Sequence, residues 1–274
     1  MAAISLVKSA LKIALNRLGY RLERTGPQYP DFLLRRRLID PAGVEVLADA
    51  DFQRSYREIE SLTLLDLPRL GNLWQLARAS SHDGALIEVG CYKGGGALHI
   101  SNACPDRAIV VCDSFAGFED LDPLLDSNFS ITEFRDASEQ AVRRLFTSRG
   151  RNATVLAGFF PASAAGMTLP RFSFAHLDVD TYKGTIETLE FLDPLFLPDA
   201  MVVLDDCNRR AEGVDQAVRE FVGRHAEWRL VPLFPAQGLL VRLGRGDSER
   251  EGAVGHSTGH DAATRPGASG PGLL

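Results

Sequence analysis

The chain has 274 residues, of which 45% are hydrophobic and 24% are charged, a composition typical of a globular protein. Asp and Glu outnumber Lys and Arg by 36 to 30, and the net charge of -6 lacks the basic excess that nucleic acid binding requires. We therefore expect one large domain with additions and no nucleic acid partner.

The first 25 residues predict an amphipathic helix. Their apolar residues recur at helical spacing, and lysines and arginines interrupt the continuous apolar run that a signal peptide needs. The apolar series is Ile4, Val7, Leu11, Leu15, Leu18 and Leu22. Packing on the same chain or on a second subunit of a homo-oligomer is the favoured interpretation. Peripheral contact with an anionic membrane surface is the alternative.

Residues 26–82 predict a helical extension or cap. Prolines and the arginines at 35–37 favour an irregular connection with one short helix up to Asp51. From Phe52 to Ala79, leucines and aromatic residues at three- and four-residue intervals predict one or two helices that cover a sheet edge.

Residues 83–244 carry apolar runs bounded by glycine or aspartate. The runs are ALIEVG, AIVVCD, NATVLAG, FSFAHLDVD, AMVVLDD, RLVPLF and GLLVRLG. Such runs predict strands buried on both faces, and hence a mostly parallel sheet with helices on both sides. The intervening helices are expected at 97–104, 137–148, 185–196 and 213–224. Asp136 is the expected cap of the second of these helices.

A tight connection at 235–238 favours an antiparallel pair at the sheet edge. The expected fold is therefore a doubly wound α/β sheet of seven strands, mostly parallel, with an antiparallel last strand and the N-terminal helical extension. Residues 245–274 are rich in Gly, Ser, Arg and Asp and predict a disordered tail.

The cysteines and the apolar runs predict a cytoplasmic protein. Cys91, Cys104, Cys112 and Cys207 form no CxxC pair and no zinc-type spacing with histidine, so we expect free thiols in a reducing compartment. No apolar run reaches the roughly 18 residues that a membrane-spanning helix needs.

The first expected strand runs into a glycine-rich turn, LIEVGCYKGGGA, that opens a helix. Ligands of open parallel sheets bind at the carboxyl ends of the strands, so this turn is a candidate site. Glu88 within it can accept hydrogen bonds from a ligand ammonium and would repel the phosphate of a dinucleotide. The alternative is that Glu88 binds the amides of its own turn.

The second expected strand ends in Asp113, about twenty residues beyond the glycine turn, which is the spacing of an acid that binds ribose hydroxyls. The alternative is a turn cap formed by Asp113 with Ser114. Together the two strand ends favour an adenosyl-type cofactor.

Two further strand ends carry aspartates. Asp178 and Asp180 are expected on one face of their strand, and Asp205 and Asp206 end the neighbouring strand. Three clustered carboxylates cannot all remain ionised without a cation, and hard oxygen ligands favour Mg²⁺. The alternative for each aspartate is a helix N-cap. For His176 on the same strand, a hydrogen-bonded core position is favoured over a catalytic base.

These residues resemble the macrocin O-methyltransferase family of class I methyltransferases, over about residues 83–244. The resemblance rests on the segments LIEVGCYKGGGA, CDSFAGF, LAGFFPASA, AHLDVDTYKGT and VVLDDCN, in this order. It implies transfer of a methyl group from S-adenosylmethionine to a hydroxyl of a sugar or sugar-containing small molecule.

The resemblance also implies the roles of individual residues. The cofactor would contact Glu88, Gly90, Tyr92, Asp113, Ser114, Phe115, Gly158, Phe159 and Asp178. Asp178, Asp205 and Asp206 would bind Mg²⁺, and catalysis would rest on Asp178 and on Asp180 as the general base. The segment 182–185 and Cys207 depart from the family pattern, which leaves the acceptor open.

Three alternatives remain at this point. The acceptor hydroxyl could be phenolic or belong to a cell-envelope glycan, or the chain could be a non-catalytic binding protein with a methyltransferase fold. A nicotinamide enzyme is disfavoured because the turn lacks the GxGxxG spacing. The acidic segment 119–136, which contains Phe129 and Phe134, is expected to form a lid over the acceptor site.

Overall fold

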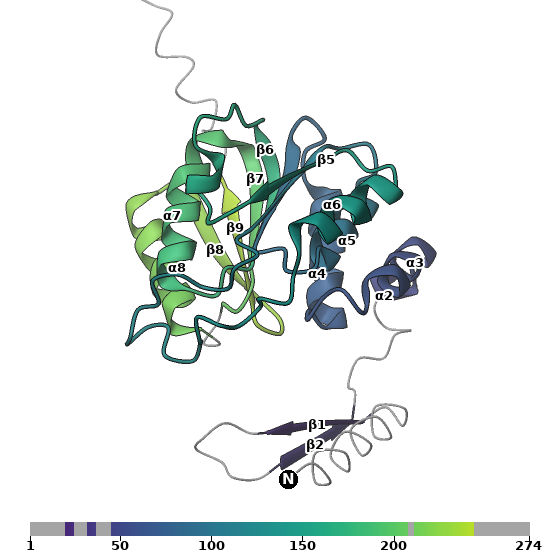
Figure 1. Ribbon diagram of the computed structural model, residues 1–274, viewed down its shortest axis with the longest axis horizontal. Helices are drawn as coiled ribbons and strands as arrows, with labels where there is room; N and C mark the ends of the chain where they lie inside the picture. Colours follow the sequence, from purple (N-terminus) through teal and green to yellow (C-terminus); the bar gives the residue numbers. More distant parts are fainter. Residues whose placement is uncertain (1–19, 25–31, 37–44, 208–210, 244–274) are drawn as a thin grey trace, which may run out of the picture. The chain divides into compact units, whose positions relative to one another are not determined.

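A seven-stranded sheet forms the centre of the computed structural model, which describes residues 20–24, 32–36, 45–207 and 211–243 (Figure 1). Its strand order is β5-β4-β3-β6-β7-β9-β8. The strands are β3 (Ala85–Val89), β4 (Ile109–Asp113), β5 (Ala153–Ala157), β6 (Phe172–Leu177), β7 (Phe196–Leu204), β8 (Trp228–Leu233) and β9 (Gln237–Arg242). All neighbours pair in parallel except β9, which is antiparallel to both β7 and β8. The predicted doubly wound sheet with an antiparallel last strand is confirmed.

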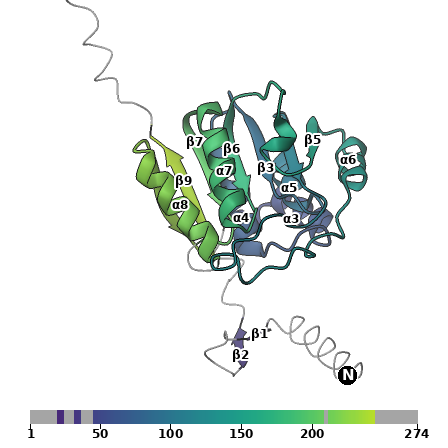
Figure 2. The same cartoon turned by 60° about the vertical axis from the view of Figure 1, so that its left-hand side comes forward.

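Helices cover both faces of this sheet (Figure 2). They are α2 (Glu45–Ala48), α3 (Ala50–Ile59), α4 (Leu67–Ala79), α5 (Gly95–Ala103), α6 (Glu139–Ser148), α7 (Tyr182–Leu192) and α8 (Glu212–Arg224). Short 3-10 turns lie at Ala162–Ala164 and Asp193–Leu195. None of the helices within the described residues combines the length and apolar character that crossing a bilayer demands.

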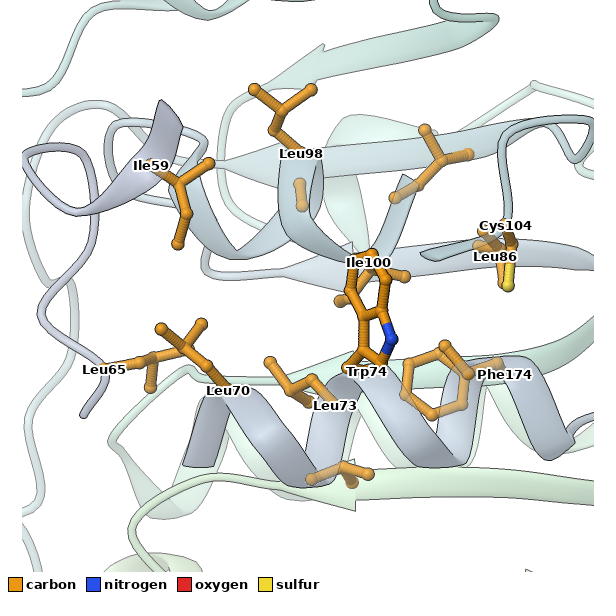
Figure 3. Close-up of a cluster of buried hydrophobic side chains, with 14 of the residues drawn as sticks. Ile59, Leu65, Leu70, Leu73, Trp74, Leu86, Leu98, Ile100, Cys104 and Phe174 are labelled. Carbon is orange, nitrogen blue, oxygen red and sulfur yellow. The ribbon is translucent and has the colours of Figure 1, made fainter. Parts of the chain in front are cut away.

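Two apolar cores result, one on each face of the sheet, because successive strand residues point to opposite sides. Leu86 of β3 packs in the core under α3, α4, α5 and α6, while its neighbour Ile87 packs in the core under α7 and α8. Figure 3 shows Leu70, Leu73 and Trp74 of α4 within the first core. Helix α4 is thus fixed against the sheet, which positions the residues at its amino end.

The segment before the sheet differs in part from the prediction. Tyr20–Arg24 (β1) pairs antiparallel with Phe32–Arg36 (β2), so the expected helix is wrong at residues 20–24 and the irregular connection contains a strand. The helical spacing that ends at Leu22 overlooked the alternation of Arg21 and Glu23 with apolar neighbours, which suits a strand with a partner. The rest of the predicted helix, residues 1–19, and the predicted tail at 245–274 lie outside the described residues.

The cap of α6 also differs. Ser138 is the N-cap and accepts a hydrogen bond from the amide of Ala141, so the prediction of Asp136 is wrong. Asp136 instead accepts hydrogen bonds from the hydroxyl of Tyr92 and the ammonium of Lys93, at 2.9 and 2.5 Å. The helix therefore keeps a local cap at Ser138, and Asp136 takes part in a tertiary ion pair with Lys93. All four cysteines are free and buried, as expected.

Candidate active site

A cavity of about 350 Å³ opens at the carboxyl ends of β3, β4, β6 and β7. All but one of the residues predicted for the site line it. They are Glu88, Gly90, Tyr92, Asp113, Ser114, Gly158, Phe159, Asp178, Asp180, Asp205 and Asp206. Phe115 is the exception: its side chain packs against the core under α5. The topology therefore brings together residues that are separated by more than a hundred positions in the chain.

The glycine-rich turn after β3 approaches the end of β6 closely. Gly90 has a φ of +89°, and a Cβ there would lie 1.9 Å from the carbonyl oxygen of Asp178. Only glycine combines this conformation with this contact. The amide of Tyr92 in the same turn donates to Asp113 Oδ2 at 2.7 Å, which ties the turn to β4.

Asp113 caps two turns at once, because its Oδ1 also accepts from the amide of Phe115 at 2.7 Å. This is the capping role that the sequence left as an alternative, although the partners are Tyr92 and Phe115 and not Ser114. Burial raises the pKa of the Asp113 carboxyl, against the lowering effect of these amides. A carboxylate has about four lone-pair sites, so the two amides do not exhaust its capacity to accept hydrogen bonds.

Glu88 is buried below the turn, with 1% of its surface exposed. Its Oε1 is 2.7 Å from Nδ1 of His176, and a Cβ at Gly96 would lie 2.3 Å from the same oxygen, so a larger residue there would have to move this carboxylate. Burial raises the pKa of Glu88, which the contact with His176 opposes. Burial alone would lower the pKa of His176, but the hydrogen bond and charge of Glu88 raise it. His176 is thus the hydrogen-bonded core histidine that the sequence favoured.

The second oxygen of Glu88 has no hydrogen-bond partner within the described residues. A buried acceptor of this kind is costly unless a donor reaches it. Since Glu88 lines the cavity, this carboxylate can receive a donor from a ligand.

The aspartates of β6 and β7 face one another as expected. The two strands are parallel with Leu177 opposite Leu204, so Asp178 and Asp205 occupy matching positions at their ends. Burial and the carboxylates of Asp205 and Asp180 raise the pKa of Asp178 well above its usual range. The N-caps of the following helices are Thr181 and Ala211, so the alternative of these aspartates as N-caps is wrong.

The sequence predicted that Asp178 and Asp180 share one face of their strand, and this prediction is wrong. Strand β6 ends at Leu177, and Asp180 has a φ of +60° in the turn before α7. Period-two alternation ceases where the strand ends, so the facing argument does not extend to this residue. Asp180 still lines the cavity, through the turn and not through the strand.

Arg69 lies among these carboxylates and was not among the residues predicted from the sequence. Its side chain, 7% exposed, forms an ion pair with Asp205 and lies 3.6 Å from Oδ1 of Asp206 and 3.5 Å from Oδ1 of Asp66. Gln237 donates to the other oxygen of Asp205 at 2.8 Å. No local motif marks Arg69, because it reaches the cluster from α4, 136 positions before Asp205.

The chemistry of three carboxylates suits Mg²⁺, but their arrangement fits it only in part. Both oxygens of Asp205 are already hydrogen-bonded, one to Gln237 and one to Arg69. Three ligand atoms that lie within 4.8 Å of one another could hold a metal ion together. Among the described residues this spacing is met at Asp193, His225 and Glu227, outside the cavity, and not at the three aspartates. An ion on Asp205 would therefore share this carboxylate with Arg69 and Gln237 and would lie close to the positive charge of Arg69.

Aromatic side chains form another wall of the cavity. Phe118 contacts Phe129 and Phe134 with ring centroids 5.3 and 5.5 Å apart, and Phe134 contacts Tyr92 at 5.8 Å. Two of these rings, Phe129 and Phe134, come from the segment 119–136 that was expected to be a lid. That segment is anchored near its middle, because the buried Asp126 accepts from the amide of Tyr182 at 2.9 Å.

The strand order, with β9 inserted antiparallel between β7 and β8, is that of a class I methyltransferase, and the cavity lies where an open parallel sheet binds its ligand. The solved structure of the O-methyltransferase NovP has the same fold, with a TM-score of 0.59 and 24% identity, covering 67% of this chain and 83% of that one. A putative caffeoyl-CoA O-methyltransferase from Staphylococcus aureus also shares it, with a TM-score of 0.50 and 10% identity over 73% of this chain and 96% of that one.

The model of the macrocin O-methyltransferase (TylF) family matches residues 61–228, and the chain belongs to this family. The mycinamicin III 3''-O-methyltransferase of Micromonospora griseorubida is 26% identical over 199 residues, 66% of this chain and 78% of that protein. The demethyldecarbamoylnovobiocin O-methyltransferase of Streptomyces niveus is 25% identical over 179 residues, 58% of this chain and 68% of that protein. The chain is therefore an S-adenosylmethionine-dependent O-methyltransferase.

Proposed function

We propose that this enzyme methylates a hydroxyl group of a sugar or a sugar-containing small molecule. The observation that carries the proposal is the cavity itself, which is lined by the carboxylates of Glu88 and Asp113 at the ends of β3 and β4, by Asp178 and Asp180 after β6, and by aromatic rings. Both related enzymes are named for the O-methylation of one small molecule, which agrees with a cavity of this size.

The cofactor occupies the end of the cavity between β3 and β4 in this proposal. Glu88 accepts a hydrogen bond from the amino acid part of S-adenosylmethionine, and Asp113 accepts from the ribose hydroxyls. Gly158 and Phe159 border the adenine, since the amide of Gly158 donates to the Asp113 carbonyl oxygen at 2.9 Å and thereby follows the end of β4. Tyr92 and Ser114 line the same end, and Phe115 acts through its amide on Asp113.

The acceptor occupies the end beside Asp178 and Asp180. The acceptor oxygen attacks the methyl carbon, the bond from that carbon to sulfur breaks, and the sulfonium becomes a neutral thioether. The hydroxyl proton passes to Asp180, the proposed general base. Asp178 orients the reacting groups, and the rings of Phe129 and Phe134 provide an apolar surface for a sugar face.

Assistance by Mg²⁺ at Asp178, Asp205 and Asp206, which the family resemblance implies, is an additional part of this proposal. A bound divalent ion would lower the pKa of the acceptor hydroxyl. Asp205 is also hydrogen-bonded to Arg69 and Gln237, so an ion would share this carboxylate with both. Asp178 and Asp206 would supply the oxygen ligands that line the cavity.

Isothermal titration with S-adenosylhomocysteine and with NAD tests the cofactor assignment without knowledge of the acceptor. We expect binding of S-adenosylhomocysteine in preference to NAD, and a loss of about tenfold or more in affinity for Asp113→Asn. Asp106→Asn, at an exposed position before the same strand, is the matched control and should bind like the wild type. Failure of the wild type to bind S-adenosylhomocysteine would contradict the proposal.

Mass spectrometry of acceptor mixtures tests the substrate class. Glycosylated natural products, free sugars, phenols and cell-envelope glycans are incubated with S-adenosylmethionine, and the methylated product is detected. We expect methylation of the sugar-bearing compounds. Methylation of phenols alone would assign the aromatic wall to phenol stacking and refute the sugar acceptor.

A further inference from the structure

The carboxylate cluster already holds a cation that belongs to the chain. The guanidinium of Arg69 lies among the carboxylates of Asp66, Asp205 and Asp206, and the electrostatic influence of Asp178 also reaches it. The side chains of Arg69 and Asp205 are 7% and 1% exposed, so water screens their attraction little. The charge that three adjacent carboxylates require is therefore supplied in part from α4.

The position of Arg69 is fixed by its helix. Asp66 caps α4 and accepts from the backbone amide of Arg69 at 3.1 Å, and its carboxylate also lies beside the guanidinium. Helix α4 is anchored by Leu70 and Leu73, which are fully buried in the core next to the sheet (Figure 3). The guanidinium is thus presented to Asp205 by a rigid element.

A second contact extends from the same guanidinium to the rim of the cavity. Nη2 of Arg69 donates to the carbonyl oxygen of Leu64 at 3.3 Å, and residues 62–65 line the cavity. A guanidinium can serve a carboxylate and a carbonyl through different nitrogens, whereas the compact ammonium of lysine presents a single charged centre.

From these contacts we infer that Arg69 is a resident cation of the methyl-transfer site, which competes with a divalent metal ion for Asp205. The inference rests on the proposed function of this cluster. An ion that bound all three aspartates would share the Asp205 carboxylate with Arg69 and would be repelled by its positive charge. The wild-type cluster therefore holds divalent ions weakly, and Arg69 is a positioning residue that keeps Asp205 in place without them.

Titration with Mn²⁺, followed by electron paramagnetic resonance of the free ion, tests this inference without an acceptor. We expect the wild type to bind Mn²⁺ with a dissociation constant of about 1 mM or weaker. Arg69→Met should bind Mn²⁺ at least about tenfold more tightly, because the competing charge is gone. Arg69→Lys should stay closer to the wild type, because it keeps the charge.

Arg78→Met is the matched control. Arg78 lies on the same helix, is half exposed and pairs with Asp49, far along α4 from the cluster, so its replacement should leave Mn²⁺ affinity unchanged. Thermal melting and titration with S-adenosylhomocysteine establish that each variant is folded. If the wild type does not bind S-adenosylhomocysteine, the proposed function is refuted. The Mn²⁺ affinities of the wild type and of Arg69→Met would still test the competition between Arg69 and a divalent ion.

Two results would overturn the inference. One is micromolar Mn²⁺ binding by the wild type, which decides the question even if Arg69→Met does not fold. The other is a folded Arg69→Met that binds Mn²⁺ no more tightly than the wild type. Either outcome would show that Asp205 does not depend on Arg69 for its counter-charge.

Discussion

His99 provides a test of how burial in the first core affects stability. It lies on α5 with no exposed surface, between the rings of Phe52 and Trp74, whose centroids are 5.1 and 5.0 Å from its own. Its Nδ1 is 2.8 Å from the hydroxyl of Ser55. Burial lowers the pKa of His99 from 6.5 to about 4, against a smaller opposing effect of the Leu70 backbone.

The direction of the pH effect follows from this lowered pKa. Between pH 6.5 and about 4 the unfolded chain binds a proton at His99 that the folded chain does not bind. The free energy of unfolding therefore falls as the pH falls through this window. The full difference between the two pKa values corresponds to about 3 kcal/mol, of which about 2 kcal/mol is lost between pH 7 and pH 5.

Urea denaturation at pH 7 and pH 5 measures the effect. We expect His99→Phe, which keeps an aromatic ring beside Phe52 and Trp74, to lose about 2 kcal/mol less than the wild type between the two pH values. Comparing the change within each protein removes the constant cost of replacing the hydrogen bond to Ser55. His82 is exposed, and His82→Gln serves as the control for replacing a histidine outside the core.

Equal losses in the wild type and in His99→Phe would refute the reasoning. Such a result would mean that His99 gains a proton in the folded protein at pH 5 at no greater cost than in the unfolded chain. The aromatic and aliphatic surroundings of the ring would then not exclude the charge, contrary to the effect of burial on a cation.

Three further replacements have expected outcomes. Gly96→Ala places a Cβ 2.3 Å from Glu88 Oε1, so S-adenosylhomocysteine should bind at least about tenfold more weakly in calorimetry. Asp126→Ala leaves the amide of Tyr182 without its acceptor, which should lower the free energy of unfolding in urea by about 1–3 kcal/mol. Arg107→Met removes a buried donor to several carbonyl and hydroxyl oxygens and should lower it by about 2 kcal/mol or more. Unchanged values would contradict each assignment.

The strands and the candidate residues at their carboxyl ends could be predicted, because both depend on local sequence. Apolar runs bounded by glycine or aspartate identify buried parallel strands, and topology then places their carboxyl ends at one edge. Glu88, Asp113 and Asp178 were found in this way, since each lies at or near the end of such a run. The glycine-rich turn was found from its run of glycines after the first strand, and the structure adds the reason for Gly90, whose backbone lies close to the carbonyl oxygen of Asp178.

Backbone conformation beyond the strands could not be predicted in the same way. Asp180 lies three residues after the end of β6, where the side chains no longer alternate with period two. It also adopts a positive φ, which the sequence did not indicate. Asp136 was expected to cap α6, but a long-range contact with Lys93 determines its position. In both cases a tertiary contact or a turn replaced the local rule.

The acidic cluster shows the same limit most clearly, because its carboxylates led to the prediction of Mg²⁺ while the structure places Arg69 among them. Neighbouring carboxylates on β6 and β7 require a counter-charge wherever they are buried together. A metal ion and a guanidinium both satisfy that requirement, and the local sequence around Asp205 and Asp206 is the same for either. The position of Arg69 depends on how α4 packs on the sheet, because the apolar face of α4 determines where the guanidinium lies. The helical extension thereby contributes a charged residue to the lining of the cavity as well as apolar residues to the core.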